Sequence, residues 1–137
     1  MSYGVAAALQ RAVFSQLNAD SGLDALVGTD IYDALPTGAL PPLYVVLGAE
    51  DVRDASDKTG GGAWHQFTVS VVTQSAGFAT AKAAAAAVSD ALVDAPLALD
   101  RGRLISLNFY KAKAARVGTG SMRQINLIFR ARVADDT

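Results

Sequence analysis

The chain has 137 residues, a length typical of one domain, and its 51% hydrophobic and 18% charged residues indicate a folded core rather than disorder or a fibre. Cysteine is absent, which excludes disulfides, thiol catalysis and cysteine-ligated metals, and the single histidine excludes histidine-rich zinc sites. No apolar run approaches the ~18–20 residues that span a bilayer, and no signal peptide is recognisable. We expect a soluble domain made inside the cell.

Charge is unevenly distributed along the chain. Residues 1–99 contain four basic and ten acidic residues, a net charge of −6, whereas residues 100–137 contain eight basic and three acidic residues, a net charge of +5. Such asymmetry is typical of an interaction surface, or of neighbouring strands whose arginines are solvated.

The N-terminal part of the chain predicts two helices. Apolar side chains recur at every fourth position from Val5 to Leu17, which predicts a helix over residues 4–18. A second, short helix is predicted over residues 23–27, because an Asp-Ser pair precedes it and Gly28 follows it.

The next segments predict strands separated by loops. A short strand is expected over residues 31–35, and a Pro/Gly-rich loop over residues 36–42. The apolar run 43–49 is typical of a strand that is buried on both faces. Residues 50–62 are acidic at first and end in three glycines, which predicts a long loop; the first half is also compatible with a continuation of the strand.

A strand and the longest helix come next. Residues 63–74 alternate between apolar and polar side chains, which predicts a strand with His65 and Phe67 on its apolar face. Apolar residues spaced by three and four positions, together with a run of five alanines, predict a helix over residues 78–94.

Two long strands close the chain. Apolar and polar residues alternate over 105–110 and 124–133, and the glycines between them predict a hairpin connection. The alternation changes phase after Phe109, so that Lys111 and Lys113 fall where apolar residues are expected. A β-bulge, or an extension of the hairpin beyond the core, explains the change.

The predicted order of elements, ααβββαββ, indicates an α+β fold in a single domain over residues 1–137. We expect two layers: a mixed or mainly antiparallel sheet of about five strands, with two main helices on one face. The other face carries polar and arginine side chains and meets water, a channel or a neighbouring subunit. We expect residues 134–137 to be mobile.

Few residues are available for catalysis. His65 is the one candidate base for a Ser-His-Asp triad, and it lies on an apolar strand face, so we interpret it as a structural histidine. The carboxylates of residues 50–57 lie in a glycine-rich segment, where the raised pKa that acid catalysis needs is hard to produce. Phosphate-binding glycine motifs and calcium loops are missing. We therefore expect no enzymatic activity, no metal and no cofactor, and a pI of about 5.6 disfavours a dedicated nucleic-acid-binding protein.

Several short stretches, taken in order and spacing, resemble one protein family. They are Ala8 to Leu17, Ala19-Asp20 with Leu23, Leu26-Val27-Gly28, Ile31 to Pro36, Pro42 to Gly48, Asp57-Lys58-Thr59, the strand that opens with His65, and Gly77 leading into Ala81-Lys82. Over about residues 8–133 the chain resembles the tail terminator or tail-completion proteins of long-tailed phages and of phage-like gene transfer agents.

This resemblance implies a structural protein of the virion. It implies a ring-forming subunit, typically hexameric, that caps the head-proximal end of the tail tube, stops its polymerisation and provides the joint to the head connector. The implied partners are further copies of the chain, the tail tube protein and the connector or neck proteins. DNA passes through the lumen without specific recognition, and no membrane is involved. The implied location is the head–tail junction of a particle assembled in the bacterial cytoplasm.

The charge asymmetry suits such a ring, because head-to-tail subunits use two different patches. We expect the basic last strands to meet the acidic segment of a neighbour or docking partner, and charge reversal at Arg130 and Arg132 to weaken assembly. The loop at 51–62 is expected to be mobile in the free subunit and ordered on docking. The predicted interface residues are Glu50, Asp51, Arg53, Asp54, Asp57, Lys58, Lys111, Lys113, Arg116, Arg123, Arg130 and Arg132.

Other interpretations stay open from the residues. A neck or head-completion ring protein on the connector side is equally compatible with this size and composition. A small α+β enzyme or ligand-binding domain requires a deep apolar pocket with polar groups near His65 or Tyr44. A nucleic-acid-binding module requires steeply salt-dependent binding.

Overall fold

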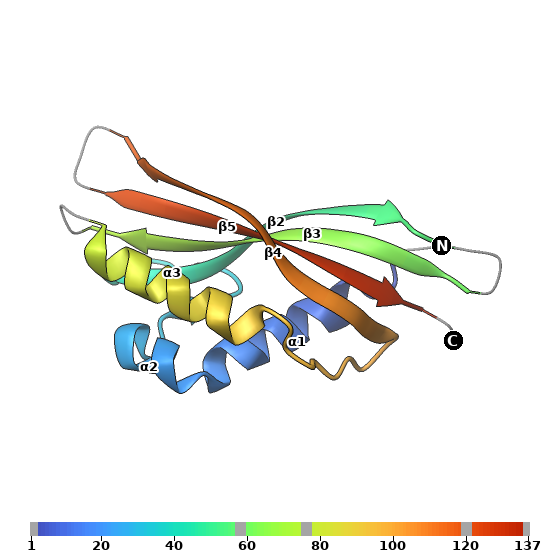
Figure 1. Cartoon of the computed structure of the whole chain (residues 1–137). Helices are drawn as coiled ribbons and strands as arrows, with labels where there is room; N and C mark the ends of the chain where they lie inside the picture. The colour runs from blue at the N-terminus through green and yellow to red at the C-terminus, as the bar shows by residue number, and fades with distance from the viewer. Residues whose placement is uncertain (1–2, 57–59, 75–77, 119–121, 136–137) are drawn as a thin grey trace.

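The computed structural model describes residues 3–56, 60–74, 78–118 and 122–135. Helices cover one face of a five-stranded sheet, so the fold is a two-layer α+β fold (Figure 1). The elements follow one another in the predicted order, ααβββαββ. Among the described residues, no helix is both long enough and apolar enough to cross a membrane.

The helix layer consists of α1 (Ala6–Ala19), α2 (Ser21–Val27) and α3 (Ala79–Leu92). The helix α2 begins where the Asp20 carboxylate accepts a hydrogen bond of 2.8 Å from the Leu23 N–H. It ends at Gly28, whose φ of 58° suits a residue without a side chain. Both features were predicted, and both follow from local chemistry.

The sheet has the strand order β1-β2-β3-β5-β4. β1 pairs with β2 in parallel, and the other three pairs are antiparallel. The sheet is therefore mixed, and β1 and β4 are its two edges, at opposite ends. The strands are β1 (Ile31–Tyr32), β2 (Leu43–Asp54), β3 (Gly62–Thr73), β4 (Arg103–Arg116) and β5 (Arg123–Ala134).

The core lies between the helices and the inner face of the two central strands. Phe67 of β3 lies opposite Phe129 of β5, and their rings stack with centroids 5.7 Å apart. Because side chains alternate along a strand, the residues between these apolar ones point to the opposite face of the sheet, which no described helix covers.

Two predictions about the first strands were wrong in detail, and at a third point the less favoured of two interpretations is the one observed. β2 continues to Asp54, so the first part of residues 50–62 extends the strand, as the alternative interpretation had it, and β3 begins at Gly62. β2 is half-buried rather than buried on both faces, because helices cover one face only. β1 covers two of the five residues predicted for it. The predictions for residues 57–59 of the loop, 119–121 of the hairpin and 136–137 of the C-terminus lie outside the described residues.

Candidate functional site

A cluster of arginines and aromatic rings lies on the open face of the sheet. The Arg130 guanidinium lies 4.9 Å from the ring centroid of Trp64 and 5.2 Å from that of Tyr110, and Arg132 lies 5.7 Å from Trp64. Each such cation–π contact contributes about 0.5–1 kcal/mol at an exposed site. The rings therefore hold two positive charges in fixed positions on an uncovered surface.

A hollow of about 260 Å³ lies beside this cluster and is lined by both signs of charge. Asp51 of β2 and Arg130 of β5 both lie opposite Gln66 of β3, one on each side of it. The sheet thus brings part of the acidic segment and part of the basic strand together within one subunit. A hollow lined by charged groups suits a polar segment of another protein better than an apolar ligand.

Arg132 also has a role inside the subunit. Its Nη2 donates a hydrogen bond of 2.7 Å to the Ala55 carbonyl, which ties the segment after β2 to β5. Charge reversal at Arg132 is therefore expected to disturb this connection as well as any interface. Arg130, which the two rings hold, is the cleaner position for such a test.

Glu50 belongs to the helix side of the sheet and not to the open face. A bulge between Leu47 and Glu50 shifts the register of β2, so that Glu50 lies opposite Phe67. Its carboxylate lies 3.2 Å from Nδ1 of His65, which is fully buried, and accepts a hydrogen bond from the Tyr3 hydroxyl. That hydrogen bond, and then the negative charge, raise the pKa of Tyr3. Glu50 was predicted as an interface residue, and that stays a prediction; the structure shows that its carboxylate also has partners within the subunit.

The space around His65 does not form a substrate pocket. A cavity lined by Leu9, Val13 and Glu50 among others has a volume of about 10 Å³, which is enough for one water molecule. A separate hollow of about 280 Å³ is lined by Tyr3, Arg11 and Glu50 among others, and His65 lines neither. His65 is buried, as expected for a structural histidine. Among the described residues, no group of three or more potential metal ligands is found.

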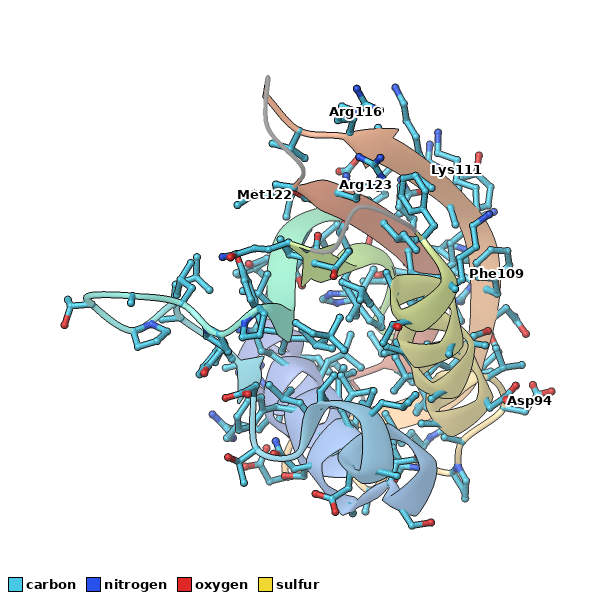
Figure 2. All side chains as sticks on the ribbon, turned by 90° about the vertical axis from the view of Figure 1, so that its left-hand side faces the viewer. Asp94, Phe109, Lys111, Arg116, Met122 and Arg123 are labelled. Atoms are coloured by element: carbon cyan, nitrogen blue, oxygen red, sulfur yellow. The ribbon has the colours of Figure 1, made fainter. Side chains whose placement is uncertain are left out.

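The far half of the β4–β5 hairpin carries a second set of basic residues. The register shifts between Phe109 and Lys111, so the predicted bulge is confirmed, and it turns Lys111 and Lys113 toward the open face. Figure 2 shows Phe109, Lys111 and Arg116 following one another along β4. Arg116 lies directly opposite Arg123, a pairing of like charges that destabilises a sheet.

The structure distributes the predicted interface residues over separate places. The open face carries Asp51, Arg53, Arg130 and Arg132, and the hairpin carries Lys111, Lys113, Arg116 and Arg123. Asp54 ends β2, where hydrogen bonds from Ser56 lower its pKa. Asp57 and Lys58 lie outside the described residues. The sequence reasoning missed the role of Trp64 and Tyr110, although Trp64 is an aromatic residue on the otherwise polar face of its strand.

Comparison with known proteins identifies a family and a similar solved structure. The model of the family "tail completion protein gp17" matches residues 11–134. A chain in the structure of the virion of a native gene transfer agent particle is 65% identical, with a TM-score of 0.93, and the match covers 97% of this chain and 99% of that chain. None of the curated proteins matches the sequence.

Proposed function

Because the chain belongs to the family of tail completion proteins, we propose that it is a ring-forming tail terminator. Family membership makes the chain a structural protein of the tail of a phage-like particle. In the proposed function, a ring of copies, six by the resemblance, caps the head-proximal end of the tail tube. The cap stops tube polymerisation and provides the joint to the head connector. The family match over residues 11–134 carries this proposal.

The geometry supports an assembly role in preference to catalysis. The charged and aromatic side chains lie on an open sheet face and on a projecting hairpin, where another protein can reach them. The one histidine, His65, is fully buried and lines none of the described hollows. In this proposal the partners are further copies of the chain, the tail tube protein and the connector proteins, at the head–tail junction. DNA passes through the lumen without specific recognition.

Deleting the gene from a producing cell tests the proposal. A terminator limits tube growth, so its loss is expected to give tubes longer than normal that lack heads, visible by electron microscopy. Supplying the chain from a plasmid is expected to restore normal length and head attachment. Tails of normal length without heads would instead identify a neck protein on the connector side. Complete particles with heads and tails of normal length in the deletion strain would overturn both the terminator and the neck-protein assignment.

A further inference from the structure

We propose that two oppositely charged flanks, which include the two edge strands of the sheet, bind each other between neighbouring copies of this chain. The acidic flank is the segment 20–35, which contains α2 and β1. The basic flank consists of residues 105–117, which are most of β4 and the residue that follows it, together with Arg123 of β5. The inference rests on the proposed ring and names the two surfaces that close it.

The acidic flank has no positive charge of its own. Between Arg11 and Arg53 the sequence contains no lysine or arginine, whereas the flank contains four aspartates. Asp24 and Asp33 are exposed, and neither forms an ion pair with a described residue. Asp33 accepts a hydrogen bond from the neutral Gln10 amide, which holds the carboxylate in place without neutralising it.

The basic flank, in turn, has no negative charge of its own. Lys111, Lys113 and Arg116 are exposed, and none of them lies within ion-pair distance of a carboxylate in the described part of the chain. Arg116 faces Arg123 across the strand pair. Like charges placed directly opposite each other cost stability in an isolated subunit, and an incoming carboxylate removes that cost.

Both flanks also expose apolar side chains. Of the seven large apolar residues that are exposed in the described part of the chain, six lie on the two flanks. Leu26 and Leu35 lie on the acidic flank, and Ile105, Phe109, Tyr110 and Val117 lie on the basic flank. Apolar residues beside charged ones are the composition of a protein–protein interface, in which the apolar part is buried and the charges form the rim.

The fold prevents one subunit from satisfying both flanks itself. β1 and β4 are the two ends of the strand order, with three strands between them. In Figure 2, β4 with Lys111 and Phe109 follows one side of the molecule, and the segment after β1 projects from the opposite side. Two different patches on opposite sides give a head-to-tail contact, which closes into a ring when the rotation between copies allows it.

A second copy of the chain is the occupant that the charges favour. A second copy accounts for both flanks at once, because the negative charge of one flank is complementary to the positive charge of the other. The contact is made by side chains and not by adding a strand to β4, since register shifts at Leu104/Ser106 and Phe109/Lys111 interrupt that edge.

Charge-swap variants test this inference. Lys111→Glu with Lys113→Glu lowers the net charge of the basic flank from +4 to zero, and Asp24→Lys with Asp33→Lys raises that of the acidic flank from −4 to zero. Each double variant is expected to associate at least about tenfold more weakly than the native chain, because the altered flank loses its net attraction to the other flank and places like charges opposite it at the substituted positions. The quadruple variant, and an equimolar mixture of the two double variants, are expected to assemble again, since opposite charges meet in both. Asp90→Lys, an exposed carboxylate on α3 outside both flanks, is the control and is expected to assemble normally.

Two readouts decide the outcome: sedimentation velocity over a concentration series, and incorporation into particles from cells that lack the native gene. Folding of each variant is checked by its urea unfolding curve. Double variants that assemble like the native chain would overturn the inference, as would a folded quadruple variant that stays unassembled. Double variants that form complete rings but fail to enter particles would assign the flanks to another tail protein, which also overturns it. Failure of the native chain in both readouts would instead contradict the proposed ring itself.

Discussion

The carboxylate of Glu50 joins β2 to His65 on β3 and to Tyr3 ahead of α1. His65 is fully buried, so removing the carboxylate leaves its Nδ1 without a partner away from water, at a cost of about 1–3 kcal/mol. We expect Glu50→Ala to lower the free energy of unfolding by that amount in urea denaturation, and Glu50→Gln, which keeps an acceptor oxygen, to lower it less. An unchanged unfolding curve for Glu50→Ala would contradict the role assigned to this contact.

Of the glycines that the structure describes, Gly102 is the one whose replacement by alanine the backbone tolerates least. It has a φ of 70°, and a Cβ there lies 2.5 Å from the Ala134 carbonyl oxygen and 2.9 Å from Val5 Cγ2. Gly118 has a similar φ of 69°, but a Cβ there has no neighbouring atom within 4 Å. Its replacement by alanine therefore costs only the backbone strain, about 1–2 kcal/mol, without a steric clash. We expect Gly102→Ala to lower the free energy of unfolding clearly more than Gly118→Ala does. Equal losses would show that the carbonyl and Val5 move aside freely.

Single residues also show which contacts could be predicted from the sequence and which could not. The alternation of residues 63–74 predicted correctly that His65 faces the core, because burial follows directly from the period of a strand. It did not predict that Glu50 is its partner. That contact depends on a bulge before Glu50, and the residues Gly48-Ala49 at the bulge have no pattern that distinguishes a bulge from a continuing strand.

Between elements, Arg11 of α1 and Asp100 ahead of β4 form an exposed ion pair at 2.8 Å. The hydrogen bonds from Arg11 hold the pKa of Asp100 below its ordinary value. A lowered pKa means that the pair stabilises the fold fully above the ordinary aspartate pKa of about 3.9 and ceases to do so as the pH falls through the lowered value.

We therefore expect Asp100→Asn to be less stable than the native chain at pH 7, and the two to converge at a pH below the lowered pKa. Since both side chains are exposed, added salt is expected to reduce the difference at pH 7 as well. Urea midpoints at the two pH values and at two salt concentrations measure this. A difference that is independent of pH would rule out the ion pair as its cause.

The elements themselves were largely predictable, and the exceptions have a common reason. The helices and the long strands follow from apolar periodicity, and the bulge after Phe109 follows from the phase change at Lys111. The extension of β2 to Asp54 was the less favoured of two interpretations. Its acidic residues suggest a loop, and pairing with β3 outweighs that preference.

At the scale of the whole molecule, the charge asymmetry of the sequence becomes a separation in space. Sequence reasoning predicted that an acidic and a basic surface would meet, and it selected the segment after residue 50 as the acidic one. The sheet places Asp51 beside Arg130 in the same subunit and puts β1, which lies between Asp30 and Asp33, at the far edge from β4. Periodicity does not encode strand order, so the sequence alone could not distinguish these two acidic segments.

In the proposed function, copies of this chain assemble into a closed ring. The most direct test is the mass of the native chain in solution, measured by light scattering behind a sizing column, alone and mixed with tail tube protein. We expect one species at six times the 14.2-kDa subunit mass, either for the chain alone or bound to the end of the tube. A chain that stays monomeric at every concentration and does not bind the tube would contradict the account.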